Sequence, residues 1–253
     1  MKKKIENLTV KANERLNDEY FELILHSPVP LPDIAPGQFA QVRVEGSEKT
    51  FLRRPISFFD VVPDERAIHL LIQEVGAGTR RLAQLVPGDP LNMIYPLGHP
   101  FSLLEGERFL LVAGGVGIAP MLLLGRQLRA AGKEPVFVFG FRSAAQLIDL
   151  SRYVDLGPLY ITTEDGSVGQ RGLVMDHPVL KETWDGVYTC GPEPMMKAVA
   201  AYAGRRELPC EASLETLMAC GIGACLCCAV PTVTGMQRAC VEGPVFNTKD
   251  LLW

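Results

Sequence analysis

Four cysteines near the C-terminus are the residues whose type and spacing most clearly predict chemistry. Cys220, Cys225, Cys228 and Cys240 follow the pattern C-x4-C-x2-C-x11-C. Cysteine thiolates hold iron–sulfur clusters, and C-x4-C-x2-C with a more distant fourth cysteine is the plant-type spacing for a two-iron, two-sulfur centre. Because such a centre carries one electron at a time, the spacing predicts an electron-transfer protein with a [2Fe-2S] cluster.

Other uses of these cysteines fit the sequence less well. Zinc sites usually repeat a C-x2-C pair, and the second pair is absent here. Disulfides are disfavoured because the charged segment 1–10 lacks the apolar core of a signal peptide. Seven cysteines in such a chain suit a reducing cytoplasm. Cys227 lies among the ligands but out of their register, and Cys210 is expected to be a buried or linker residue.

A second group of residues is suited to binding phosphate. Arg54-Pro55-Ile56-Ser57 begins with an arginine, whose planar fork can clamp a pyrophosphate. About twenty residues later, the glycine-rich turn 76–80 is followed by a short helix expected over 79–85. Backbone N–H groups in such a turn suit an anion.

A third motif, Ala113-Gly-Gly-Val-Gly-Ile-Ala-Pro120, directly follows the apolar run FLLVA. Glycines at this point of an α/β unit let the phosphates of a dinucleotide approach the backbone. The last glycine of G-x-G-x-x-G is replaced by Pro120, so a plain strand–helix turn stays an alternative. The end of the next strand, Gly140–Ser143, carries no acidic residue for a ribose, which leaves NADH or NADPH open.

The last apolar strand ends in Thr189-Cys190-Gly191-Pro192, a sharp loop expected to start a helix at Pro194. The turn Glu164-Asp165-Gly166-Ser167 is expected at the same edge of the sheet. Ligands of open α/β sheets bind at the carboxyl ends of the strands, so both loops are predicted to border the nucleotide site.

The elements that must position these motifs fall into three groups. Short alternating segments with turn signals predict a small antiparallel β-barrel in the first hundred residues. The expected strands are 6–12, 20–26, 38–44, 56–62, 67–74 and 90–95. Apolar runs that alternate with helices, the first over 116–131, then predict an α/β doubly wound parallel sheet. The predicted domains are 1–104, 105–208 and a small C-terminal iron–sulfur domain at 209–253.

Composition excludes several classes of protein. The 253 residues are 47% hydrophobic and 21% charged, which is ordinary for a globular protein. A net charge of −4 gives no reason to propose nucleic-acid binding. No apolar run approaches the ~20 residues that a membrane-spanning helix needs, so no membrane association is expected.

The order of the motifs resembles the ferredoxin–NADP reductase superfamily. Arg-Pro-x-Ser, Gly-x-Gly-Thr, Gly-Gly-x-Gly-x-x-Pro, Asp-Gly-Ser and Cys-Gly-Pro follow one another between residues 50 and 200. The cysteine spacing narrows the match, and the chain resembles the electron-transfer subunits of the NAD-dependent, type B bacterial dihydroorotate dehydrogenases. The resemblance implies an FAD barrel, then an NAD domain, then the cluster domain.

The resemblance also implies roles for individual residues. Arg54 and Thr79 would hold FAD phosphates, Ser57 would lie near the flavin ring, and Cys190, the implied catalytic residue, would lie near the nicotinamide. The other implied FAD contacts are Pro55, Ile56, Leu71, Ile72, Gln73 and Gly78. The implied NAD contacts are Gly114, Gly115 and Gly117, and the implied cluster ligands are Cys220, Cys225, Cys228 and Cys240.

In that family the partner is an FMN-containing dihydroorotate dehydrogenase catalytic subunit, in a heterotetramer of two copies of each chain. Electrons would pass from the partner's FMN through the cluster and FAD to NAD+, in pyrimidine biosynthesis. The alternative is a reductase subunit of another cytosolic complex, of the NADH-dependent ferredoxin–NADP oxidoreductase or sulfhydrogenase type. A non-catalytic redox sensor is a third hypothesis, and it would have no use for the nicotinamide loops.

Overall fold

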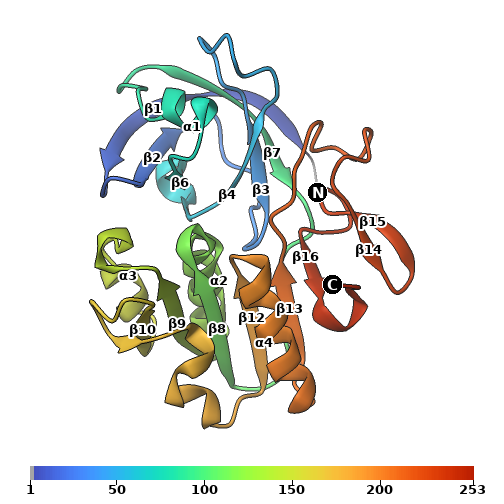
Figure 1. Cartoon of the computed structure of the whole chain (residues 1–253). Coiled ribbons are helices and arrows are strands. Elements are labelled where there is room, and N and C mark those ends of the chain that lie inside the picture. Colours follow the sequence, from blue (N-terminus) through green and yellow to red (C-terminus); the bar gives the residue numbers. More distant parts are fainter. Residues whose placement is uncertain (1–2) are drawn as a thin grey trace.

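The computed structural model describes residues 3–253; the first two residues of the charged N-terminal segment lie outside it. A curled antiparallel sheet, a parallel sheet flanked by helices and a small C-terminal lobe lie against one another (Figure 1). The predicted fold class is confirmed. The domain boundaries near residues 104 and 208 stay predictions. Two strands of the second sheet come from the chain beyond residue 208.

The first sheet, here called the barrel, has the strand order β4-β3-β7-β1-β2-β6-β5, and all neighbouring strands are antiparallel. It curls around an apolar core that includes Leu8, Leu23 and Leu70. Its elements are β1 (Lys4–Arg15), β2 (Tyr20–His26), β3 (Phe39–Val42), β4 (Arg54–Ser57), β5 (Asp60–Val62), β6 (Ala67–Gln73), α1 (Ala77–Leu82) and β7 (Pro90–Leu97).

The segment 56–62, expected as one strand, is two strands at opposite edges of the barrel sheet. The chain turns at Phe58 and Phe59, which are 1% and 0% exposed. Phe58 packs in the barrel core against Tyr95, with ring centroids 6.4 Å apart. Phe59 packs against Tyr153 of helix α3 (Ser151–Val154), in the core of the second sheet. Because these two adjacent rings are buried in different cores, the alternation of inward and outward side chains that a single strand requires is interrupted.

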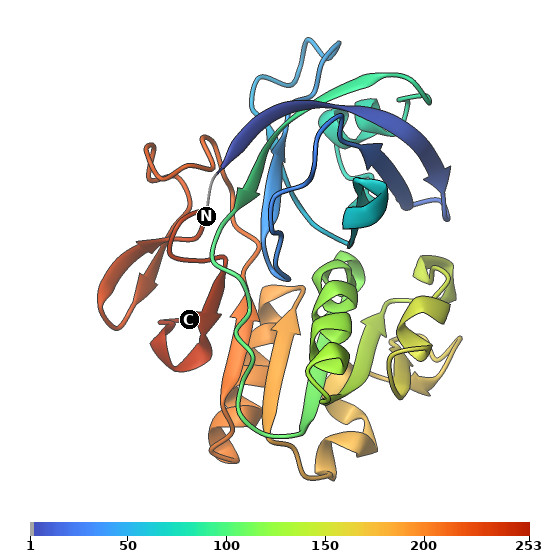
Figure 2. The same ribbon diagram turned by 180° about the vertical axis from the view of Figure 1, so that it is seen from behind.

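The second sheet has the order β11-β10-β9-β8-β12-β13-β16, and only the last pair is antiparallel. Helix α2 begins at Ala119 rather than at 116, because the 3-10 turn η2 (Gly115–Ile118) comes first. Figure 2 shows α2 in front of this sheet, directly below the barrel. The elements are β8 (Arg108–Gly114), α2 (Ala119–Ala130), β9 (Glu134–Phe141), α3 (Ser151–Val154), β10 (Leu159–Thr163), β11 (Gln170–Arg171), β12 (Gly186–Cys190), α4 (Glu193–Arg205), β13 (Cys210–Ser213) and β16 (Val245–Asn247).

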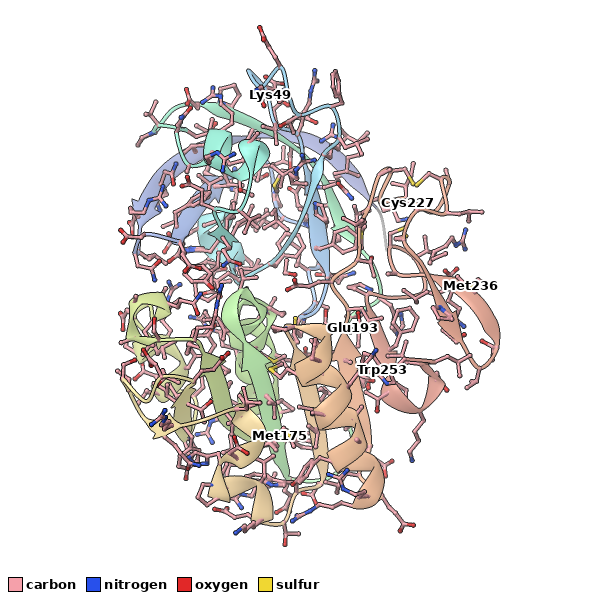
Figure 3. The ribbon with its side chains drawn as sticks, in the orientation of Figure 1. Lys49, Met175, Glu193, Cys227, Met236 and Trp253 are labelled. Atoms are coloured by element: carbon pink, nitrogen blue, oxygen red, sulfur yellow. The ribbon has the colours of Figure 1, made fainter. Side chains whose placement is uncertain are left out.

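The cysteine lobe, residues 214–244, lies between β13 and β16. It contains one hairpin of β14 (Ala229–Thr232) and β15 (Gly235–Arg238). The amide of Leu214 donates to the Pro244 carbonyl at 2.9 Å, so the two ends of the lobe meet at its base. In Figure 3, Cys227 lies on the lobe beside the barrel, and Met236 lies further out on the hairpin.

A buried charge cluster joins the barrel to the second sheet. Arg152 of α3 donates two hydrogen bonds to Glu22 of β2, at 2.5 and 3.1 Å. His69 Nδ1 lies 2.6 Å from Glu22, and Arg126 of α2 lies 2.9 Å from Asp60 of β5. Glu22 and Asp60 are 3% and 2% exposed. Buried carboxylates need such partners, so these contacts fix how the two sheets face each other.

In the part of the chain that the structure describes, no helix is long and apolar enough to span a membrane.

Candidate functional site

The site consists of two adjoining clefts and the cysteine lobe. The first cleft, here the barrel cleft, has a volume of about 510 Å³, within the range of ligand pockets. Its walls come from β4, β6, the start of α2 and the residues that lead into the lobe. Eight of the predicted FAD contacts line it: Arg54, Pro55, Ile56, Ser57, Leu71, Ile72, Gln73 and Thr79.

The two adjacent arginines have different environments. Arg54 lines the barrel cleft, where its Nη1 donates to the carbonyls of Leu52 and Arg53. Arg53 turns toward the sheet, and its guanidinium donates to the Gln41 carbonyl and to Asn92. Arg54 is therefore placed to hold an anion, whereas Arg53 braces β3 against β7.

Thr79 lines the barrel cleft, whereas Gly78 does not line it. A Cβ at Gly78 would lie 2.9 Å from Arg54 Nε, so the glycine makes room for the arginine. The Thr79 hydroxyl accepts from the amides of Val75 and Gly76, at 2.9 and 3.1 Å. That hydroxyl is thus already used to cap its own turn.

The second cleft, here the nucleotide cleft, has a volume of about 410 Å³ and opens at the carboxyl ends of β8, β9, β10 and β12. Gly114 and Gly115 line it, and a side chain at Gly114 would meet Met195 Sδ at 2.9 Å. Gly117 does not line it: a Cβ there would lie 2.3 Å from the Cys190 carbonyl oxygen. Gly117 lets the turn pack onto β12, which is a supporting role.

Cys190 lines the barrel cleft, beside the junction with the nucleotide cleft. It is 2% exposed, and burial raises the pKa of its thiol well above the usual value. The thiol is therefore neutral at physiological pH. It can pack against a ring, but it is not activated as a nucleophile.

The two clefts meet at Gln73, Val116 and Glu215, which line both of them. Glu215 lies in the open mouth between the clefts, and the surrounding protein atoms raise the pKa of its carboxyl. Sequence reasoning missed Glu215, because it follows β13 with no motif of its own. It also missed Tyr20, which reaches the nucleotide cleft from the barrel.

The four predicted ligand cysteines lie in the lobe as two pairs. Cys220 contacts Cys225, and Cys228 contacts Cys240. The Cys220 sulfur accepts from the amides of Ile222, Ala224 and Cys225 at 3.3–3.5 Å. These hydrogen bonds, led by that of Ile222, lower the pKa of Cys220 to about 6. Burial instead raises the pKa of Cys240 to about 12.

The pairing fits a two-iron centre. Among residues 3–253, no three His, Cys, Asp or Glu side chains converge on one metal position. A [2Fe-2S] cluster takes two ligands on each iron, and its sulfurs are tuned by backbone donors such as those around Cys220. Cys227 is exposed, and its thiol donates to the Leu217 carbonyl at 3.6 Å rather than joining either pair.

Arg238 of β15 braces the cysteine loop. Its Nη1 donates to the Gly223 carbonyl at 3.0 Å, between the first two cysteines. Its Nε donates to Glu242 at 3.1 Å, and Nη2 makes a further contact with the same carboxylate. The hydrogen bonds from Arg238 lower the pKa of Glu242 to about 2. The sequence offered no sign of this brace.

Within residues 3–253, buried polar atoms without a hydrogen-bond partner occur in both clefts. Thr216 Oγ1 is buried without a partner in a residue that lines the barrel cleft. Tyr20 Oη and Thr162 Oγ1 are buried without a partner in residues that line the nucleotide cleft. Such atoms are costly unless a ligand satisfies them, so both clefts fit polar ligands.

Comparisons with known proteins agree with this geometry. Residues 215–252 match the family model described as the iron–sulfur cluster binding domain of dihydroorotate dehydrogenase B. A dihydroorotate dehydrogenase B (NAD(+)) electron transfer subunit from Shouchella clausii is 38% identical over 100% of both chains. The subunit of the same name from Caldanaerobacter subterraneus is also 38% identical, over 96% of this chain and 97% of its own.

Solved structures extend the likeness to the fold. A chain of the NADH-dependent reduced ferredoxin-NADP oxidoreductase superposes with a TM-score of 0.88 at 29% identity, over 97% of this chain and 90% of its own. The cytochrome P450 reductase GcoB from Amycolatopsis superposes with a TM-score of 0.71 at 23% identity, over 81% of this chain and 67% of its own, and shows the fold alone.

The fold combines a curled barrel with a parallel sheet, and the barrel cleft meets the nucleotide cleft at the carboxyl edge of that sheet. This arrangement defines a reductase of the ferredoxin–NADP reductase type. The cysteine lobe adds an iron–sulfur domain to that class. Full-length identity of 38% then settles the family: the chain belongs to the electron transfer subunits of dihydroorotate dehydrogenase B (NAD(+)).

Proposed function

We propose that this chain carries electrons from a dihydroorotate dehydrogenase catalytic subunit to NAD+, through a [2Fe-2S] cluster and FAD. The observation that carries the proposal is the continuity of the three sites. Residues 213–218 line the barrel cleft and lead directly to Cys220. Gln73, Val116 and Glu215 then join the barrel cleft to the nucleotide cleft.

FAD is proposed for the barrel cleft. Its chemistry is to exchange a hydride with nicotinamide and single electrons with an iron–sulfur cluster. Arg54 would hold the pyrophosphate through charge-assisted hydrogen bonds. Ser57 and the strand 71–73 would border the flavin ring, and Thr216 Oγ1 supplies a buried polar atom without a protein partner.

NAD(H) is proposed for the nucleotide cleft. Gly114 and Gly115 would let the phosphates approach the backbone, with Gly117 as support. The nicotinamide would enter the junction, where the Cys190 thiol borders the barrel cleft. Because that thiol is buried and neutral, its proposed role is to position the rings for hydride transfer.

The catalytic partner is proposed to dock over the cysteine lobe. Three apolar side chains around the cysteines are exposed: Leu217 by 86%, Ile222 by 50% and Leu226 by 61%. Met218 and Leu251 instead pack in a core shared with the barrel residue Phe39. We infer an FMN-containing partner, two copies of each chain, and a cytoplasmic location.

The experiment is reconstitution. The chain alone, loaded with FAD and iron, is expected to reduce dyes with NADH but not to oxidise dihydroorotate. Addition of the FMN subunit should give dihydroorotate-dependent NAD+ reduction. Substantial NAD+ reduction with dihydroorotate by this chain alone would contradict the subunit assignment.

The structural likeness to the NADH-dependent reduced ferredoxin-NADP oxidoreductase favours one second candidate, a reductase subunit in a complex of that type. The two candidates differ in the partner rather than in this chain. Purification of the native complex separates them, because only the first contains a protein that oxidises dihydroorotate.

A further inference from the structure

The barrel contributes one unexplained residue to the nucleotide cleft. Tyr20 begins β2 and pairs with Gln73 on β6, yet it lines the nucleotide cleft. The residue is 2% exposed and packs with the core of the second sheet. Its backbone is fixed by a 2.8 Å hydrogen bond from its amide to Asn17 Oδ1. A tyrosine held in this way cannot easily turn its ring elsewhere.

The Tyr20 hydroxyl has no hydrogen-bond partner among the described residues. Buried tyrosine hydroxyls normally find one, because an unmade bond leaves the desolvation cost uncompensated. The acid next to it is already engaged: the Glu19 carboxylate accepts from Gln73 Nε2 at 2.8 Å and from Gln146 Nε2 at 2.9 and 3.1 Å. The hydroxyl is therefore free to bond a ligand.

The position of the hydroxyl indicates which part of a ligand it meets. A Cβ built on Gly115 would lie 3.5 Å from Tyr20 Oη, so the oxygen lies against the turn that follows β8. This turn is where the phosphates of a dinucleotide approach the backbone in α/β folds. Gly115 has φ +55° and no side chain, so no Cβ stands over the oxygen.

Charge and protonation also favour a donor role. Burial raises the pKa of Tyr20 to about 12, so the phenol keeps its proton at physiological pH. The carboxylates of Glu19 and Glu215 also raise this pKa, and Arg142, which follows β9 and lines the same cleft, lowers it. A phenol that keeps its proton suits an acceptor oxygen.

We propose that Tyr20 is a positioning residue for the nucleotide, whose hydroxyl donates a hydrogen bond to the pyrophosphate–ribose portion of NAD(H) at the Gly114–Gly115 turn. This inference rests on the proposed function, because it takes NAD(H) as the ligand of the cleft. It adds a nucleotide contact from the barrel, where sequence reasoning placed only flavin contacts. The barrel would then help to set the position of the nucleotide relative to the flavin.

The test is Tyr20→Phe in the full chain loaded with FAD and iron. Titration calorimetry with NAD+ and with ADP-ribose, which lacks the nicotinamide, should show both ligands bound about tenfold more weakly, or ~1.4 kcal/mol. Without nucleotide, the melting temperature should stay the same or rise, because the variant loses a buried hydroxyl that has no partner. The rise in melting temperature on addition of NAD+ should shrink.

The matched control is Tyr188→Phe. The Tyr188 hydroxyl is satisfied, accepting from the Leu104 amide at 3.0 Å and donating to the Ser102 carbonyl at 2.9 Å. Its loss should lower the melting temperature and leave both affinities unchanged. A merely structural Tyr20 would behave like this control, with a lower melting temperature and unchanged affinities.

Two results would overturn the inference. Equal NAD+ affinity in wild type and Tyr20→Phe would show that Tyr20 does not contact the nucleotide. A lower affinity for NAD+ with an unchanged affinity for ADP-ribose would show that the contact is with the nicotinamide. Failure of the proposed function is distinguishable, because then the wild type itself would not bind NAD+ or would show no bleaching of its flavin by NADH.

Discussion

The two clefts and the cysteine lobe are held in shape by different means. The clefts are lined by strands whose inner faces form large apolar cores, with residues such as Leu23 and Phe137 fully buried. The lobe has one short hairpin, and Leu217 beside its first cysteine is 86% exposed. Buried apolar area is the main stabilising term in folding, so the clefts exist before any ligand binds. The lobe shares only a smaller apolar core with Phe39 and Leu97 of the barrel, and it depends more on polar contacts and on its cluster.

The largest expected effect is loss of the cluster from the lobe with no loss of FAD from the barrel cleft. Cys225→Ser should abolish the visible absorbance of the cluster and reduce the iron content to near zero, because one of four ligands is lost. FAD content and NADH–dye reductase activity should remain, because the main apolar cores around the clefts and most of the residues that line them lie outside the lobe. Cluster-dependent transfer to the partner should disappear.

Cys227→Ser is the matched control, because this exposed thiol lies outside the two pairs. It should keep the full iron content. A cluster that survives Cys225→Ser but is lost in Cys227→Ser would show that the ligand assignment is wrong.

The next effect tests the barrel cleft alone. Arg54→Ala should weaken FAD by about one to two decades, since a charge-assisted hydrogen bond contributes ~1.5–3 kcal/mol and a decade is ~1.4 kcal/mol. Arg54→Lys should recover only part of this, because an ammonium loses the planar fork. FAD retention through gel filtration measures the effect.

Arg53→Ala serves as the neighbouring control. Its guanidinium bonds Gln41 and Asn92, so its loss should lower the melting temperature and spare FAD. The assignment fails if FAD is lost from Arg53→Ala and kept by Arg54→Ala.

A smaller effect is expected for the brace of the lobe. Arg238→Ala should release iron to a chelator several-fold faster, because Gly223 loses its tie to Glu242. FAD affinity should not change. Arg108→Ala is a suitable control, because this arginine forms ion pairs with Glu134 and Glu182, outside the lobe. Equal iron release from the Arg238 variant and the wild type would mean that the cluster needs no such brace.

The smallest effect concerns the buried charges between the two sheets. Burial tends to raise the pKa of Glu22, but hydrogen bonds with His69 and Arg152 outweigh it and hold that pKa below 4.5. A lowered folded-state pKa means that the ionised carboxylate adds stability above about pH 4.5 and loses it as the pH falls through the folded value. Glu22→Gln should therefore lower the melting temperature at neutral pH by a few degrees, for a loss of ~1–3 kcal/mol.

The difference between wild type and Glu22→Gln should shrink in acid. Glu65→Gln removes an exposed pair with Lys11 and should change little at any pH. A difference for Glu22→Gln that stays constant down to strongly acidic pH would show that its charge does not stabilise the fold.

Features that depend on local sequence patterns were predicted, whereas those that depend on packing between distant segments were not. Turn signals and alternating apolar runs are local, so the strand 20–26 was predicted with its observed bounds. Arg54 and Gln73 are nineteen positions apart, yet both line one cleft, as the motif order and the family resemblance implied. The split of 56–62 was missed because the two cores that hold Phe58 and Phe59 do not exist in a local window.

No local sequence pattern pointed to the residues whose contacts join segments that are far apart in the chain. Tyr20 meets Gly115 only because β2 lies over the second sheet, and Arg238 meets Gly223 only because the hairpin folds back on the cysteine loop. Glu215 joins the two clefts through the path of the chain after β13. Such contacts depend on tertiary packing, and periodicity carries no information about it.

The pairing of Ser213 with Val245 makes the cysteine lobe an excursion between two neighbouring strands, not a tail. Its ends close on each other through Leu214 and Pro244, so a short turn in its place would keep β13 beside β16. The same turn would remove residues 214–218 from the wall of the barrel cleft. One loop therefore carries both the cluster ligands and part of the flavin-side cleft, so a change in its length alters one-electron chemistry and that cleft together.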